Sequence, residues 1–202
     1  GDHRDLHLSL RRQRQMCIRD SFMLTGELMT SATITDRLVA LSRALIGRIR
    51  GGLAQVNVLV SMFFAGMNGS VVADTATVGA LVLPAMKKAG YPAAFSAAVT
   101  GVSSTIGGII PPSIMMIVLA NSTEISIAAL FAAGIIPGVL IGVVIMIINH
   151  YFAIKYNFER SDEPFSIRRA GKELYRSSFA LLIPLVLVGS VMGGVASVVE
   201  AG

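Results

Sequence analysis

Two short polar segments interrupt the apolar stretches of this sequence and carry groups that could bind a small cation. The first, residues 68–70 (Asn-Gly-Ser), lies between apolar runs at 53–67 and 71–86. The second, residues 103–113, is rich in hydroxyl side chains and contains two glycines followed by two prolines. Hydroxyl, amide and freed backbone carbonyl oxygens can replace the hydration shell of a sodium ion. Segments of this kind therefore point to ion-coupled transport.

Asp74, four residues after Ser70, is the acidic side chain next to the first segment. A carboxylate inside a membrane is a candidate functional group, and the first turn of a helix stabilises negative charge. Local structural support and a role in an ion site or in gating both stay open. As a catalytic pair, Asp74 and Ser70 lack a His or Lys partner, and the common hydrolase and nucleotide-binding motifs are absent. We predict no enzyme activity, and no cofactor beyond sodium as a coupling ion.

The composition places the chain in a membrane. Hydrophobic residues make up 53% of its 202 residues and charged residues only 14%, whereas soluble domains carry roughly 25%. Charge-free stretches are long enough to hold the roughly 20 apolar residues of a spanning helix. The only cysteine, Cys17, excludes an intrachain disulfide and a cysteine-rich metal site. We therefore predict an all-α integral membrane protein.

The segment 51–88 is predicted to form a re-entrant helical hairpin. It begins after Arg48 and Arg50 and ends at Lys87 and Lys88, and basic flanks favour the cytoplasmic side for both ends. Each apolar run would reach roughly 23 Å as a helix, which is less than the roughly 30 Å hydrocarbon core. The alternative, two ordinary spans joined by an outside turn, stays open.

The next segment, 89–156, is predicted to contain a broken helix and then a spanning helix. Pro111 and Pro112 lack backbone N–H donors and clash with the preceding turn, so they end the helix. The carbonyls freed in this way are tolerated at membrane depth only inside protein or along a polar cavity. In the following charge-free helix, residues 128–152, three glycines spaced four apart allow another helix to approach closely.

The remaining segments flank these elements. Residues 1–21 are polar and arginine-rich, and we predict a non-native or disordered leader that is similar to translated adapter sequence. Residues 22–50 are predicted to hold the end of a membrane helix and an amphipathic interfacial helix. Residues 157–202 are predicted to hold a cytoplasmic loop helix and the start of a second repeat, and the chain is expected to be truncated at both ends. The loop helix carries basic residues at every fourth position, namely Arg168, Lys172 and Arg176.

Both interrupted elements resemble the large membrane subunit of tripartite ATP-independent periplasmic (TRAP) transporters. The matching stretches are RGGLAQVNVLVSMFFAGMNGSVVADTATVGALVLPAMKKAGY and AAFSAAVTGVSSTIGGIIPPSIMMIVLA, within a likeness that runs from about residue 22 to the end. The resemblance implies the first inverted repeat of an elevator-type transporter in the bacterial inner membrane. It also implies sodium-driven import of small organic acids, with a small membrane subunit and a periplasmic substrate-binding protein as partners.

The resemblance further implies a first sodium site between the hairpin tip and the broken helix. Its predicted residues are Asn68, Gly69, Ser70, Ser103, Ser104, Thr105, Gly107 and Gly108, with Pro111 and Pro112 forming the helix break. Asn68 stands where many family members have a small residue or Ser, and Gly108 where many have Pro. The hairpin and broken helix of a second repeat are absent from the sequence, so we expect that this polypeptide alone does not transport.

Three other functions fit the sequence less well. A sodium/dicarboxylate-type symporter of similar architecture, working without a binding protein, is the main alternative. A passive channel would not need two interrupted elements, and the TVGYG filter of potassium channels is absent. An intramembrane enzyme would need a catalytic pair that the sequence does not supply.

The charge pattern predicts the membrane topology, with residues 87–91 and 155–176 in the cytoplasm and 121–127 in the periplasm. A single cysteine at position 124 should be labelled by a membrane-impermeant thiol reagent in intact cells. Cysteines at positions 89 and 165 should be labelled only after the membrane is permeabilised. The reverse pattern would overturn the orientation.

Overall fold

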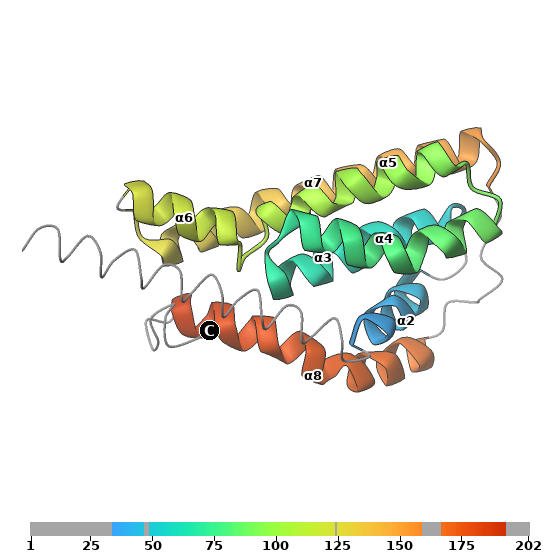
Figure 1. Cartoon of the computed structure of the whole chain (residues 1–202). Coiled ribbons are helices and arrows are strands. Elements are labelled where there is room, and N and C mark those ends of the chain that lie inside the picture. The colour runs from blue at the N-terminus through green and yellow to red at the C-terminus, as the bar shows by residue number, and fades with distance from the viewer. Residues whose placement is uncertain (1–33, 47–48, 124, 159–166, 193–202) are drawn as a thin grey trace, which may run out of the picture.

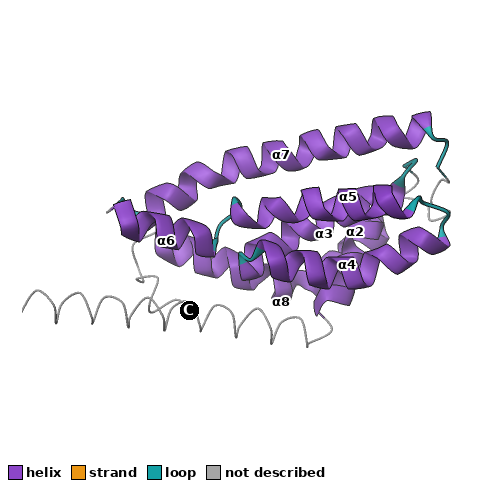
Figure 2. Ribbon diagram, turned by 45° about the horizontal axis from the view of Figure 1, so that its top comes forward, coloured by secondary structure: helices purple, strands orange, loops and turns teal. Residues whose placement is uncertain are grey.

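The computed structural model describes residues 34–46, 49–123, 125–158 and 167–192, and its regular elements there are all helices (Figures 1 and 2). In chain order they are α2 (Ile34–Ile46), α3 (Gly52–Asn68), α4 (Val71–Lys88), α5 (Ala93–Ser104), the 3₁₀ helix η1 (Thr105–Gly108), α6 (Ile114–Thr123), α7 (Ile127–Lys155) and α8 (Ile167–Met192). The predicted all-α class is confirmed for these residues. The predicted leader and the helix end expected after residue 22 lie outside the described part.

The helices α3, α4, α5 and α7 lie side by side and form the main bundle (Figure 1). The helix α6 lies beyond the end of α5 and packs on α7. The helices α2 and α8 pack against each other, and α2 also covers α3. The core between α3 and α4 is filled by apolar side chains such as Phe64, Val60 and Val78, all fully buried.

A tight turn joins α3 to α4 because its two residues suit a helix end and a helix start. Gly69 has a φ of 57°, a left-handed conformation that favours glycine, and its N–H donates to the carbonyl of Ala65. Ser70 is the N-cap of α4, and its hydroxyl accepts from the N–H of Ala73 at 3.4 Å. The two helices match the predicted apolar runs to within two residues at each end.

The interruption predicted after α5 is present. The α-helix ends at Ser104, η1 follows, and α6 begins only at Ile114. The prolines at 111 and 112 cannot donate backbone hydrogen bonds. Ser113 compensates, because its hydroxyl donates to the carbonyl of Gly108 at 2.8 Å and accepts from the N–H of Met116 at 3.4 Å. The hydrogen bonds of this side chain thus replace part of the backbone hydrogen bonding that the prolines interrupt.

The 29-residue helix α7 is the one helix in the described ranges that is long and apolar enough to cross a membrane. It begins after Ser126, whose hydroxyl accepts from the N–H of Ala129, and it continues through Pro137. Its three glycines lie against other segments. A Cβ at Gly134 would lie 2.6 Å from the carbonyl oxygen of Ile109, and one at Gly138 would lie 2.6 Å from the side chain of Ile110. The glycine stripe therefore brings α7 against the interrupted segment.

The helices α2 and α8, which pack outside the main bundle, each differ from the prediction. In α2, Leu38 and Leu41 are fully buried while Arg37 and Arg43 are exposed, so its apolar face is covered by α3 and α8. The basic loop helix and the following apolar span were predicted as separate elements, yet they form the single helix α8. The apolar span was expected to begin at residue 177, but neither Gly nor Pro stands at that boundary, and the good helix formers Lys172, Glu173 and Leu174 precede it.

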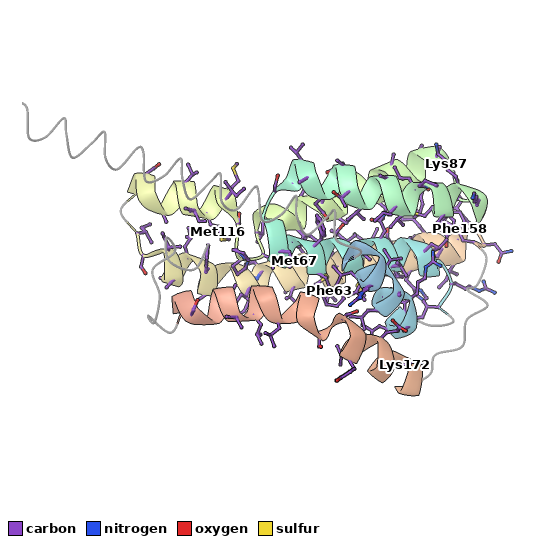
Figure 3. The ribbon with its side chains drawn as sticks, turned by 60° about the horizontal axis from the view of Figure 1, so that its bottom comes forward. Phe63, Met67, Lys87, Met116, Phe158 and Lys172 are labelled. Carbon is purple, nitrogen blue, oxygen red and sulfur yellow. The ribbon has the colours of Figure 1, made fainter. Side chains whose placement is uncertain are left out.

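Aromatic rings close the end of the bundle away from the hairpin tip. Tyr91, in the turn between α4 and α5, lies 4.6 Å from Phe158 between ring centroids, and Phe95 lies 5.2 Å from Phe158. Figure 3 shows Lys87 and Phe158 together at this end, with Met67 further along the bundle. Aromatic and basic side chains together are typical of a membrane–water interface.

Replacing Gly134 with Ala should destabilise the protein by about 1–3 kcal/mol, because the added methyl meets the backbone of Ile109. Gly142→Ala should lower the stability less than Gly134→Ala, since its added methyl meets only the flexible side chain of Met62. Thermal unfolding in detergent measures both. Gly101→Ala is the control: nothing lies within 4 Å of its added Cβ, and alanine is the better helix former. Equal stability of Gly134→Ala and Gly101→Ala would contradict the packing of α7 described above.

Candidate functional site

The hairpin tip lies directly against the interrupted helix. A Cβ at Gly69 would lie 2.8 Å from the Cα of Ser113 and would overlap the carbonyl oxygen of Pro112. From the other side, a Cβ at Gly107 would lie 3.8 Å from the backbone of Val71. The two polar segments that sequence analysis singled out are therefore in backbone contact, although 34 or more residues separate Gly69 from the break in the sequence.

Asp74, one turn into α4, is the central charged group of this region. Its side chain has no exposed surface, and neither carboxylate oxygen has a hydrogen-bond partner. The hydroxyls of Ser104 and Ser61 face the carboxylate, but neither reaches hydrogen-bonding geometry with it. The hydroxyl of Ser104 is also buried without a partner. Three polar oxygens without partners thus gather where α3, α4 and the end of α5 meet.

A buried network of polar side chains leads up to this region along α3 and α5. Asn57 donates from Nδ2 to the Thr100 hydroxyl at 2.7 Å. The hydroxyls of Ser61 and Ser103 lie 3.1 Å apart, and Ser103 can also donate to Oδ1 of Asn57 at 3.5 Å or to the carbonyl of Thr100 at 3.1 Å. All four side chains are at least 98% buried. Such a network in a membrane bundle joins two helices by polar contacts.

The predicted site residues contribute in different ways. Gly69 lies against the backbone of Pro112 and Ser113, and Gly107 and Gly108 lie beside Val71. Ser103 and Ser104 lie in the buried polar region. The Thr105 hydroxyl is exposed and donates to the carbonyl of Val102 at 2.7 Å. The hydroxyl of Ser70 caps α4, the side chain of Asn68 is not described, and Pro111 and Pro112 are buried within the break.

Sequence reasoning missed Asn57 and Ser61, although a signal was available. They lie four residues apart in the apolar run 53–67, and this spacing places both on one face of a helix. The missing information was the direction of that face. In the structure it points toward α5 and the first turn of α4.

The donor set suits a hard cation. It consists of a carboxylate, hydroxyls and backbone carbonyls, which are the ligands that such ions prefer. No group of three or more His, Cys, Asp or Glu side chains comes together within the described residues. An ion held here would contact both the hairpin and the interrupted helix.

Residues 13–202 match the family described as tripartite ATP-independent periplasmic transporter, DctM component. The chain belongs to this family. Its members are integral membrane transporter permeases rather than enzymes, and the predicted likeness to the large TRAP permease subunit is confirmed. The match begins within the stretch that sequence analysis set aside as a leader.

Curated relatives agree with this assignment. The sialic acid TRAP transporter permease protein SiaT of Haemophilus influenzae is 38% identical over 181 residues, which are 89% of this chain and 29% of the relative. The C4-dicarboxylate TRAP transporter large permease protein DctM of Pseudomonas aeruginosa is 36% identical over 180 residues, 89% of this chain and 42% of the relative. The 2,3-diketo-L-gulonate TRAP transporter large permease protein YiaN of Escherichia coli is 36% identical over 181 residues, 90% of this chain and 42% of the relative. The chain thus spans less than half the length of these relatives.

Gly69→Ala tests the contact between the TRAP hairpin tip and the break. Gly90 is a matched control, because it too has a positive φ (79°) while nothing lies within 4 Å of an added Cβ. Both changes cost about 1 kcal/mol of backbone strain, and only Gly69→Ala adds a clash with the backbone of Pro112, worth about 1–3 kcal/mol more. Thermal unfolding of a complete permease that carries one substitution or the other measures the two losses of stability. If both variants lose the same stability, the tip does not pack on the break.

Proposed function

We propose that this chain is the part of a large TRAP permease subunit that holds one sodium site of a sodium-driven secondary transporter. The complete transporter would import small organic acids across the bacterial inner membrane as a multi-pass protein. It would work with a small membrane subunit and a periplasmic substrate-binding protein. Membership of the TRAP family supports this proposal over its main alternative, a sodium/dicarboxylate-type symporter that works without a binding protein.

The observation that carries the proposal is the unpaired carboxylate of Asp74 at the junction of the two interrupted elements. A buried charge without a partner is very unfavourable in an apolar interior, and within a membrane such groups mark ion or substrate pathways. A sodium ion would neutralise the carboxylate and use the free hydroxyl of Ser104 as a further ligand. The role of Asp74 that sequence analysis left open is thereby assigned to the ion site.

The ligand set predicted from the resemblance is kept in part and extended. Backbone carbonyls at the tip and in the break, together with the hydroxyls of Ser103 and Ser104, are the predicted part. Asp74 and Ser61 are added because they lie beside Ser104 in the buried polar region. The Thr105 and Ser70 side chains are left with the structural roles that their hydrogen bonds indicate.

Helix lengths support the re-entrant hairpin and the elevator-type architecture. The helices α3 and α4 have 17 and 18 residues, or about 26 Å each, which is short of the roughly 30 Å core. A tip that stops inside the membrane, against a broken helix, would place the ion near the midplane, as in other transporters with interrupted helices. Rigid movement of such a unit would carry ion and substrate across together.

The substrate class is proposed from the relatives. Their names specify sialic acid, C4-dicarboxylates and 2,3-diketo-L-gulonate, and all of these compounds carry carboxylate groups. A small organic acid is therefore the proposed substrate of the complete transporter.

Ser104→Ala should raise the sodium concentration for half-maximal uptake about tenfold while leaving folding intact, because one of several ion ligands is lost. High sodium should restore most of the uptake. Asp74→Asn should give a larger loss, because it removes the charge that neutralises the ion. The assay is sodium-dependent uptake by proteoliposomes containing the complete permease and its partners.

Thr105→Ala is the matched control for Ser104→Ala, since it removes a neighbouring hydroxyl that is exposed and bonded to the Val102 carbonyl. It should stay within about twofold of the wild type. Wild-type sodium activation in both Ser104→Ala and Asp74→Asn would show that the ion lies elsewhere.

A further inference from the structure

The helices α3 and α7 pack in an antiparallel register that two close contacts define. At the start of α3, a Cβ at Gly51 would overlap the Cβ of Ala153. Three turns further along α3, the side chain of Met62 lies against Gly142. In both contacts the two residue numbers add to the same total, because one number rises as the other falls. The register is therefore the same along this part of the interface.

This register places Gln55 of α3 opposite Asn149 of α7. Each lies one turn inside the contact of Gly51 with Ala153, so both amides fall on the stripes that face each other. Both side chains are buried, with exposed fractions of 3% and 4%. Gln55 already reaches α7, because its Nε2 donates to the carbonyl of Met146 at 2.7 Å, one turn from Asn149.

Each of the two amides keeps one polar atom without a partner. A carbonyl can only accept, so the bond to Met146 fixes Nε2 of Gln55 on that side and turns Oε1 to the other. Oε1 of Gln55 has no hydrogen-bond partner, and neither has Nδ2 of Asn149. An acceptor of α3 and a donor of α7 are therefore buried at the same level of the interface without bonding to each other.

The neighbouring side chains of this interface are apolar. Toward the hairpin tip, Val58 and Ile145 belong to one buried apolar cluster, and toward the other end Gly51 meets Ala153. Unpaired amide groups are unfavourable in an apolar interior, and bulk water does not reach them at membrane depth. A ligand that satisfies both atoms must accept one hydrogen bond and donate another.

A water molecule meets this requirement. It offers both hydrogens and lone pairs, whereas a cation would be repelled by the N–H groups of Asn149 and an anion by the amide oxygen of Gln55. Buried waters in proteins bridge polar groups that have no other partner. We propose that Gln55 and Asn149 hold one buried water molecule that bridges α3 and α7.

The bridging water gives the base of the hairpin a polar joint to α7. The apolar contacts around it tolerate a small shift of one helix along the other, but such a shift separates the two amides. The joint therefore fixes the register of α3 against α7. It lies about 20 Å along α3 from the turn at Gly69, so it is separate from the proposed sodium site and does not rest on the proposed function.

A high-resolution density map of the complete wild-type permease tests the site directly. The expected result is one peak of solvent density within about 3.2 Å of both Oε1 of Gln55 and Nδ2 of Asn149. A direct hydrogen bond between the two amides, or no density between them, would overturn the proposal.

A double-mutant cycle tests the same site through stability. Asn149→Leu leaves Oε1 of Gln55 without the bridge, and Gln55→Leu does the same to Nδ2 of Asn149. The double variant removes both atoms and leaves an apolar interface, which is less unfavourable than one unpaired group. Its loss of melting temperature should be smaller than the two single losses together by at least about 2 °C, the order of one buried hydrogen bond. Thermal unfolding of the complete permease in detergent measures all four proteins.

Asn57→Leu is the matched control for Gln55→Leu. Asn57 is a buried amide two residues away on α3, but it donates to Thr100 on α5. Combined with Asn149→Leu, it should give additive losses to within about 1 °C. Additive losses for Gln55→Leu with Asn149→Leu as well would show that the two amides share no ligand, and would reject the site. If a single variant does not fold, the density map of the wild type decides.

Discussion

The low polarity of the bundle interior constrains every polar group in this protein, and the carboxylate of Asp74 is the group most affected. Water cannot solvate the carboxylate there, so the protein must supply a partner for it or bind a ligand that serves as one. The surrounding elements hold Asp74 in this position. The turn at Gly69 and Ser70 fixes the start of α4, and the end of α5 closes over the same region. The burial of a charge is thus a consequence of how two helix ends meet.

Most of the helical framework could be predicted from the sequence because its signals are local. Apolar runs, a glycine–serine turn and a pair of prolines set the ends of α3, α4 and α5 to within a few residues. The continuity of α8 was missed, because a change from basic to apolar composition does not by itself end a helix. The polar partners Asn57 and Ser61 were missed for another reason. A single polar residue in an apolar helix shows its role only when the rotation of that helix against its neighbours is known.

Glycines of the turn between α3 and α4 and of the helix α7 contact different parts of the interrupted segment. Gly69 meets the backbone at Pro112 and Ser113, while Gly134 and Gly138 of α7 meet Ile109 and Ile110. An irregular backbone has fewer internal hydrogen bonds than a helix and depends on close packing to keep one conformation. Side chains larger than hydrogen at these positions would push the covering helices away. The glycine pattern therefore keeps the carbonyls of the break in fixed positions.

The side-chain amides of Asn57 and Gln55 tie α3 to two different neighbours. Asn57 ties α3 to α5, and the serine hydroxyls extend this tie toward α4, whereas Gln55 ties α3 to α7 through one bond to a backbone carbonyl. An ion between α4 and the end of α5 would strengthen the first group of contacts and leave the second unchanged. A ligand can shift a conformational equilibrium only through such differential contacts. Sodium at the proposed site would thus favour conformations in which α3, α4 and the end of α5 keep their mutual contacts.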